Sequence, residues 1–350
     1  MPIKKLRVGM IGCGHISSQH GPAWIASPDS DLVAICDQDP TRLAQKAAAW
    51  GVVRTYSDPS EMIRHENLDA VDIVTRPASH AALVQLAANN KLHVLCQKPL
   101  ASTLAEATEI AKTCDAAGSR FMVTEMWRFL PWFRLMREEV DRGAIGRPYY
   151  LRVVGARRPM ARSHPVNPNQ PYFAEMPMLI IYELMIHWID AARYVLGEVE
   201  SVFARSVRIN PVIAGEDAAV VVLTHERGAT SNLDGSWSAH GFPPGPTREG
   251  DIVLEGSAGA LHFAPQSGEM RRSTDAGVEV IGTFADMAVA FQSAFTACIG
   301  HFAQAVRTGQ PFESSGMDNL RTLDVTLAAY RSIETGEVIR TLAPALVEQI

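Results

Sequence analysis

Residues Leu6–Ser17 read LRVGMIGCGHIS, a short apolar run followed by a glycine-rich turn. The run has the length and composition of a buried strand, and the turn should open a helix. Backbone N–H groups of the turn, together with the N-terminus of that helix, could hold a pyrophosphate. The cofactor contacts predicted here are Gly12, Gly14, His15 and Ile16. Serine takes the third glycine position and is small enough for close helix packing, so the stretch predicts the start of a dinucleotide-binding domain.

Apolar runs continue to alternate with helical stretches as far as Glu125. Four more runs have the character of strands: Leu32–Cys36, Ala70–Thr75, His93–Cys96 and Phe121–Thr124. They lack polar alternation, as expected of parallel strands that are covered on both faces. Pro40–Trp50, with Gly51 as a stop, is expected to form one covering helix. This β-α-β order predicts an α/β fold with a doubly wound parallel sheet.

The pattern changes near residues 125–130, and we expect one domain over 1–126 and a second over 127–350. A chain of 350 residues exceeds the usual size of one hydrophobic core, which agrees with two domains. Val199–Phe284 offers longer strands separated by glycine and proline turns, so the second domain should contain a large, predominantly antiparallel sheet. Two closing helices should pack against the two domains, at about Met287–Gly309 and Gly316–Gly336.

Composition excludes several classes of function. The 32 basic and 38 acidic residues give a formal net charge of −6 without a block of like charges, which argues against a nucleic-acid partner. No apolar run is long enough to cross a bilayer and the start lacks a signal core, so we expect no membrane partner and a cytoplasmic location. The five cysteines lack CxxC spacing, which favours buried reduced thiols over disulfides or structural zinc.

Asp37 ends the second predicted strand, about 20 residues after the glycine-rich turn. An acidic side chain at this place can accept hydrogen bonds from the ribose hydroxyls of adenosine, and its charge repels a 2′-phosphate. The sequence therefore favours NAD over NADP, although Arg42 could lean the other way. The alternative for Asp37 is a residue that only caps a turn.

Further short motifs follow in order along the chain. They are Thr75–His80 (TRPASH), Gln97–Leu100 (QKPL), Gly143–Pro148 (GAIGRP), Ala329–Ser332 (AYRS), and the set Glu183, His187 and Asp190. With the glycine-rich turn, they resemble the Gfo/Idh/MocA family of glucose–fructose oxidoreductase, inositol dehydrogenase and rhizopine catabolism proteins. The resemblance runs nearly end to end. It implies an N-terminal Rossmann domain, a C-terminal α/β domain with a large open sheet, and NAD(P)-dependent oxidation of sugar or cyclitol hydroxyls.

The resemblance also implies further cofactor contacts at Thr75, Pro77, His80, Gln97 and Lys98. For His80, a structural role at the start of a helix is the favoured alternative. Three positions depart from the family pattern. Gln97 replaces the usual glutamate, Glu183 replaces aspartate, and Met126 replaces a frequent asparagine. The glutamine keeps hydrogen-bonding capacity but removes a negative charge beside Lys98.

Met178–Leu196 is predicted to be a helix in which most side chains are apolar. Its polar residues are Glu183, His187, Asp190 and Tyr194, which helical spacing places on one face. A polar stripe on an otherwise apolar helix indicates an internal cleft, because buried polar groups without partners are costly. The alternative is a self-satisfied internal network, with Glu183 against His187.

Oxidation of a carbinol needs a group that accepts the hydroxyl proton while the hydride leaves. Histidine is the natural acceptor near neutral pH, so we assign His187 as general base. Lys98 would orient the hydroxyl and stabilise negative charge on its oxygen, and Glu183 would fix the histidine tautomer or hold a neighbouring hydroxyl. The hypothesis requires the tips of Lys98 and His187 to meet over the cofactor. Pro99 is expected to form a cis bond or tight turn that directs the lysine.

Substrate contacts are expected from Lys98, Glu183 and His187. Further candidates on or near the polar, proline-rich stretch 159–177 are Trp127, Arg157, His164 and Tyr172. A loop of that length in a compact domain is commonly functional, so it is the candidate substrate loop. A metal site at Glu183, His187 and His164 is disfavoured because a third ligand with suitable geometry is not evident.

Three readings of the function remain open. The leading one is an NAD-dependent dehydrogenase of a sugar, glycoside or cyclitol hydroxyl. The second is an enzyme that retains NAD and cleaves a glycosidic bond through transient oxidation. The third is a non-catalytic, sugar-responsive regulator, against which the retention of both Lys98 and His187 speaks. An open-faced sheet usually needs a partner, and the resemblance suggests a homodimer or homotetramer.

Overall fold

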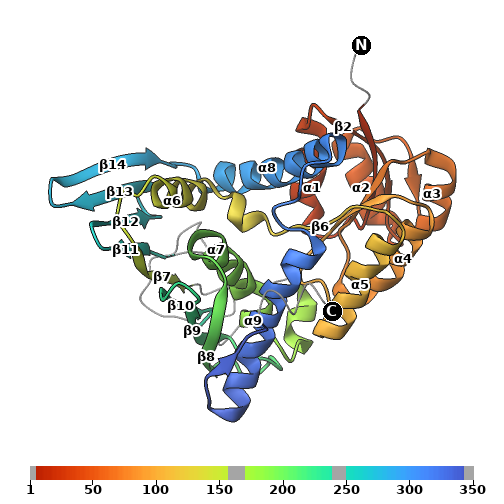
Figure 1. The fold of residues 1–350 in the computed structure, drawn as a ribbon. Helices are drawn as coiled ribbons and strands as arrows, with labels where there is room; N and C mark the ends of the chain where they lie inside the picture. The colour runs from red at the N-terminus through yellow and green to blue at the C-terminus, as the bar shows by residue number, and fades with distance from the viewer. Residues whose placement is uncertain (1–4, 157–169, 239–249, 343–350) are drawn as a thin grey trace. The chain divides into compact units, whose positions relative to one another are not determined.

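The computed structural model describes residues 5–156, 170–238 and 250–342. The chain divides into two compact units (Figure 1). Among the described residues, the first unit comprises 5–126 together with Gln292–Leu320, and the second comprises those of Trp127–Phe291 and 321–342. No helix among the described residues is long and apolar enough to span a membrane.

The first unit is built on a six-stranded sheet in which every pair of neighbours is parallel. In the order β3-β2-β1-β4-β5-β6, the strands are Thr55–Tyr56, Ser30–Cys36, Leu6–Ile11, Ala70–Ile73, His93–Cys96 and Phe121–Val123. The helices between them are α1 (Ser17–Ala26), α2 (Pro40–Trp50), α3 (Pro59–Glu66), α4 (His80–Asn89) and α5 (Leu104–Ala116). The predicted Rossmann sheet is confirmed. The two-residue edge strand β3 was not predicted, because it is too short to leave a periodic pattern.

Local chemistry explains why α2 begins and ends where it does. Asp39 accepts hydrogen bonds from the backbone N–H groups of Thr41 and Arg42, and Pro40 occupies the first helical position. At the other end, Gly51 adopts the left-handed conformation with a φ of 67°. The predicted helix Pro40–Trp50 is therefore confirmed to the residue.

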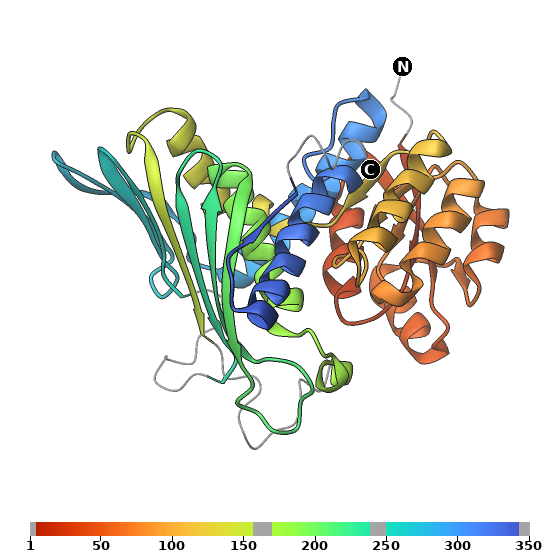
Figure 2. The ribbon, with the colours of Figure 1, turned by 60° about the horizontal axis from the view of Figure 1, so that its bottom comes forward.

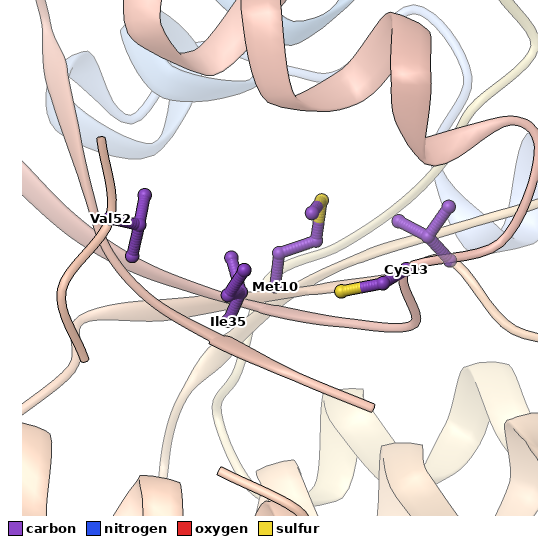
Figure 3. Packing of buried hydrophobic residues seen from close by; sticks show 5 residues of the cluster. Met10, Cys13, Ile35 and Val52 are labelled. Atoms are coloured by element: carbon purple, nitrogen blue, oxygen red, sulfur yellow. The ribbon is translucent and has the colours of Figure 1, made fainter. Parts of the chain in front are cut away.

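A core cluster beside the glycine-rich turn is packed from β1, β2, the turn itself and the segments that follow α2 and β4. Figure 3 shows Met10, Cys13, Ile35 and Val52 of this cluster, which Val74 completes. Burial of a side chain such as Met10, which is 0% exposed, contributes about 1.5–3 kcal/mol. The cluster holds the ends of these strands in place beneath the turn.

The first unit also takes in chain from beyond the expected boundary. The returning segment begins at Gln292 within helix α8 (Met287–Thr308), and Phe302 of this helix packs edge-on against Trp24 of α1 with centroids 6.0 Å apart. Ser314 then donates a hydrogen bond to the backbone oxygen of Val123, at 2.7 Å. The sequence predicts all of 127–350 in the second domain, whereas Gln292–Leu320 belongs to the first unit. The apolar face of α8 is what joins it there.

The second unit contains a nine-stranded sheet in the order β14-β13-β12-β11-β7-β10-β9-β8-β15. In that order the strands are Gly277–Thr283, Glu269–Thr274, Gly259–Ala264, Ile252–Gly256, Pro148–Ala156, Thr230–Ser236, Ala218–His225, Val199–Val207 and Ile339–Arg340. Within the described residues all neighbours pair antiparallel apart from β10 with β7, which confirms the predicted sheet.

Helices α6 (Pro131–Asp141), α7 (Ile186–Leu196) and α9 (Gly316–Thr335) accompany this sheet. Figure 2 shows α7 and α9 against one of its faces. Gly235 of β10 permits a close approach of α7, since a Cβ at this position would lie 3.2 Å from the Trp188 ring. The sheet is thus the support on which the helix with Glu183 and His187 rests.

Candidate functional site

The glycine-rich turn follows β1 and begins with a backbone conformation that only glycine adopts easily. Gly12 has a φ of 107°, and a Cβ there would lie 2.5 Å from the backbone oxygen of Val74. A Cβ at Gly14 would instead meet nothing within 4 Å. Ser17, in the third glycine position, donates from its hydroxyl to the backbone oxygen of Gly14 at 2.6 Å. The serine therefore closes the turn, while the backbone at Gly14 stays open to a ligand.

Asp37 follows β2 and supports the same turn. Its Oδ2 accepts a hydrogen bond from the backbone N–H of Cys13 at 2.6 Å, and its Oδ1 accepts from the N–H of Asp39 at 2.8 Å. The side chain is half-buried. The turn-capping role that was the alternative is therefore present, and the remaining lone pairs of the carboxylate leave the predicted ribose contact open.

The segment Thr75–His80 follows β4. Pro77 starts a short 3-10 turn, and Thr75 accepts a hydrogen bond from the Ser79 hydroxyl at 2.7 Å. The buried His80 ring lies with Nδ1 3.0 Å from the backbone oxygen of Leu100 and Nε2 3.2 Å from that of Thr75. Burial lowers the pKa of His80. The ring ties the segments after β4 and β5 together, as the structural alternative for this histidine expected.

Gln97 and Lys98 follow β5, and the Lys98–Pro99 peptide bond is cis, as predicted. Gln97 is only 5% exposed. Its Nε2 lies 2.6 Å from Nε2 of His20, and its Oε1 accepts a hydrogen bond from the backbone N–H of Lys98 at 3.2 Å. The Gln97 amide is thus engaged at both ends, while the Lys98 side chain is half-buried.

These groups share one edge of the sheet in the first unit. The turn follows β1, Asp37 follows β2, Thr75 follows β4 and Gln97 follows β5. In open parallel sheets, ligands bind outside the carboxyl ends of the strands. The predicted cofactor residues of this unit are therefore gathered where that rule expects them.

In the second unit, Glu183 lies in a π-helical turn, Ile181–Met185, that leads directly into α7. Such turns are frequent at functional sites. His187 sits in the first turn of α7, 6% exposed, and its ring stacks on Trp127 with centroids 5.0 Å apart and an angle of 2° between the planes. Trp127 is 1% exposed, so one face of its indole is occupied by the histidine. Trp127 thereby holds the imidazole plane.

The other two members of the polar stripe are committed to internal contacts. Arg128 forms a two-pronged ion pair with Asp190, donating from Nε to Oδ2 at 2.8 Å and from Nη2 to Oδ1. Tyr194 accepts a hydrogen bond from Arg134 at 2.9 Å. The polar stripe that was predicted to line a cleft is therefore divided in two. Its C-terminal half, Asp190 and Tyr194, pairs with arginines from the short turn before α6 and from α6 itself.

Glu216, which is not among the predicted site residues, caps the π turn. Its Oε1 accepts hydrogen bonds from the backbone N–H groups of Leu179 and Ile181, each at 3.1 Å, and from the Tyr330 hydroxyl at 2.6 Å. Burial raises the pKa of Glu216. Glu216 stands just before the predicted strand Ala218–His225. Nothing in the neighbouring sequence indicates that its side chain contacts the N-terminus of a helical turn.

Tyr172 is half-buried, and its hydroxyl accepts a hydrogen bond from Gln170 at 3.1 Å. Arg157 and His164 lie outside the described residues. Among the residues that the structure describes, no group of three or more His, Cys, Asp or Glu side chains could hold a metal ion.

Two family models match the chain. Residues 6–125 match the oxidoreductase family with an NAD-binding Rossmann fold, and residues 133–262 match the Gfo/Idh/MocA C-terminal domain. The chain belongs to the Gfo/Idh/MocA oxidoreductase family. The resemblance seen in its short motifs is confirmed, and the protein is an oxidoreductase of this family.

Named relatives of the family cover nearly the whole chain. D-apiose dehydrogenase of Paraburkholderia graminis is 33% identical over 347 residues, which is 96% of this chain and 90% of that protein. Myo-inositol 2-dehydrogenase of Thermotoga maritima is 31% identical, covering 94% of this chain and 96% of that protein. An oxidoreductase from Agrobacterium radiobacter, solved with NAD+, L-tartaric acid and magnesium, has a TM-score of 0.88 at 32% identity, covering 96% of this chain and 98% of that one.

The first unit of this Gfo/Idh/MocA protein fits NAD. The open backbone at Gly14 lets a phosphate approach closely, and the N-terminus of α1 adds backbone N–H groups that favour an anion. Asp37 supplies an acidic side chain at the end of β2. The predicted cofactor is therefore confirmed as NAD for this domain.

Proposed function

We propose that this protein is an NAD-dependent dehydrogenase that oxidises a secondary hydroxyl of a sugar, glycoside or cyclitol. The observation that carries the proposal is His187, a histidine held flat against Trp127 on the helix that follows a π turn. Membership of the family and the sugar and inositol dehydrogenases among its relatives support the substrate class. The negative charge of Asp37 supports NAD over NADP.

In this proposal His187 takes up the hydroxyl proton of the substrate at a ring nitrogen. The Lys98 ammonium donates a hydrogen bond to the same oxygen and stabilises the negative charge that develops there. Glu183 orients the imidazole or holds a neighbouring hydroxyl. Bound NAD supplies the hydride acceptor. The stack on Trp127 keeps the His187 ring in one plane, which lowers the entropy lost when the proton is transferred.

We further propose the cofactor contacts of the first unit. The residues are the backbone of Gly12, Gly14, His15 and Ile16, the side chain of Asp37, and the segments containing Thr75, Pro77, His80, Gln97 and Lys98. The polar side-chain atoms of His80 and Gln97 already contact groups within the first unit. We therefore propose that these two side chains position the residues around the cofactor as well as contacting it. Trp127 and Tyr172 remain proposed substrate neighbours.

We also propose that the substrate domain begins near Trp127 and that its nine-stranded sheet mediates a homodimer or homotetramer. Valines on the edge strand β14 support this assembly, since Val278 is 69% exposed and Val280 is 51% exposed. Light scattering of the purified protein would measure the assembly. A monomer at micromolar concentration would contradict it.

The test of the activity is reduced-nicotinamide absorbance with a panel of sugars, polyols and cyclitols, using NAD and NADP in parallel. We expect turnover with NAD, and a loss of about 10²–10⁴ in kcat for Lys98→Met and for His187→Gln. The exposed Lys112 and the half-buried His262 of the nine-stranded sheet, which contacts Asp251, give matched controls, Lys112→Met and His262→Gln, which should keep parental kinetics.

Binding of NAD to His187→Gln should stay within about 2-fold of the parent, measured by calorimetry, because this variant alters proton handling and leaves the proposed cofactor contacts of the first unit unchanged. Release of free sugar from a glycoside without accumulation of NADH would contradict the proposal and favour glycosidic cleavage through transient oxidation. Unchanged kinetics of His187→Gln would remove His187 as the base.

A further inference from the structure

Three buried polar side chains form a row inside the first unit. The Oδ2 of Asp72, on β4, lies 2.7 Å from Nδ1 of His20, on α1. Nε2 of the same ring lies 2.6 Å from Nε2 of Gln97, after β5. Asp72 and His20 are 0% exposed and Gln97 is 5% exposed. The row ends at the backbone N–H of Lys98, which donates to Oε1 of Gln97.

Donor and acceptor counting fixes the protonation of this row. The Lys98 N–H can only donate, so the Gln97 oxygen must face it and the Gln97 NH₂ group must face His20. Nε2 of His20 is then an acceptor, because a proton there would point at an N–H group. The ring proton therefore sits on Nδ1 and is donated to Asp72.

The neighbours of His20 named here are uncharged apart from Asp72, and the neutral ring follows from the N–H donor of Gln97 at Nε2. The indole of Trp24, also on α1, donates to the same Asp72 oxygen at 2.6 Å. Phe295 of α8 lies against the imidazole with centroids 5.2 Å apart. Cys96 of β5 adds a buried thiol. Burial raises the pKa of this thiol well above its ordinary value, so the thiol is neutral. The negative charge facing the ring is that of Asp72, which accepts its Nδ1 proton.

We propose that Asp72, His20 and Gln97 form a positioning relay for Lys98, in which His20 stays neutral and protonated at Nδ1. The inference rests on the role proposed above for Lys98 and deepens it. Asp72 sets the tautomer of His20, His20 orients the Gln97 amide, and that amide fixes the backbone from which the lysine side chain projects. Gln97 is matched to a neutral histidine, because a glutamate there would accept a proton from Nε2 and favour the imidazolium.

The first test reads the ring itself in the full-length protein labelled with 15N-histidine, where the His20→Gln variant assigns the His20 signals. We expect the neutral Nδ1–H pattern of long-range 1H–15N couplings at neutral pH. Gln97→Glu should convert His20 to the doubly protonated ring at neutral pH. An Nε2–H tautomer or an imidazolium in the parent would overturn the relay.

The second test reads the lysine. Gln97→Met removes both amide contacts at similar volume, so amide hydrogen exchange at Lys98 should speed up about 10-fold or more and kcat should fall about 10-fold with the sugar KM within 2-fold. Gln85→Glu, on the exposed face of α4, is the control and should change neither. Unchanged exchange in Gln97→Met would overturn the positioning role. If Gln97→Met does not fold, His20→Gln is measured by the same exchange and judged by the same outcome.

These readouts separate the relay from the proposed activity. Absence of turnover in the parent with every sugar would refute the proposed function, while the tautomer and the exchange rate would still confirm or refute the relay.

Discussion

Gly12 and Gly14 stand in the same turn and should respond to alanine in opposite ways. At Gly12 the φ of 107° is costly for any L side chain, and a Cβ would lie 2.5 Å from the backbone oxygen of Val74 and 2.8 Å from its carbonyl carbon. A left-handed conformation costs about 1–2 kcal/mol and overpacking about 1–3 kcal/mol. Gly12→Ala should therefore destabilise the apoprotein by about 2–5 kcal/mol.

At Gly14 the new methyl group meets nothing within 4 Å, and the residue is not among those with positive φ. Alanine at a compatible position stabilises by about 0.4–1 kcal/mol, because the unfolded chain loses freedom. Gly14→Ala should thus fold as well as the parent or slightly better. In the proposed cofactor site the methyl group lies where the pyrophosphate approaches the backbone, and a steric cost of about 1–3 kcal/mol would weaken NAD binding by about 5- to 150-fold.

Urea denaturation of the apoprotein and calorimetric titration with NAD separate the two effects. NAD binding by Gly14→Ala equal to that of the parent would refute this placement, because the open space at Gly14 would then not be where the cofactor lies. If Gly12→Ala unfolds at the same urea concentration as the parent, the close contact with Val74 relaxes without cost and the predicted destabilisation is wrong.

Three more predictions concern single carboxylates. Asp37→Asn removes the charge that repels a 2′-phosphate, so the ratio of NADP to NAD turnover should rise at least several-fold, and an unchanged ratio would argue that Asp37 only supports the turn. Asp190→Asn leaves the buried Arg128 without its full partner and should cost about 3–5 kcal/mol in urea denaturation, whereas a loss below about 1 kcal/mol would contradict the ion pair. Burial raises the pKa of Glu216 above its ordinary 4.5, so the folded protein keeps this proton to higher pH than the unfolded chain. The stability that the protonated Glu216 contributes below pH 4.5 is therefore lost as the pH rises through the pKa of the folded protein. Glu216→Gln has no such loss, so its free energy of unfolding should increase relative to that of the parent over the same pH range. A stability difference that stays constant from pH 4.5 to 8 would count against a buried titrating carboxyl.

The sequence alone determined the features that depend on near neighbours. Apolar runs marked the central parallel strands, and the limits of α2 followed from Asp39, Pro40 and Gly51. The glycine-rich turn and the order of the short motifs were enough to predict the fold, the family and NAD. These signals are local because propensity, capping and turn chemistry act over a few residues.

Only the tertiary structure decided which polar groups meet. His20 lies 52 positions from Asp72 and 77 from Gln97 along the chain. Nothing in the sequence of helix α1 indicates that its histidine contacts either residue. The stack of Trp127 on His187 likewise joins separate segments. One carboxylate inside the apolar strand Ala70–Ile73 was the available hint, since a buried charge needs a partner. The identity of that partner is set by the packing of α1 on the sheet, which periodicity does not encode.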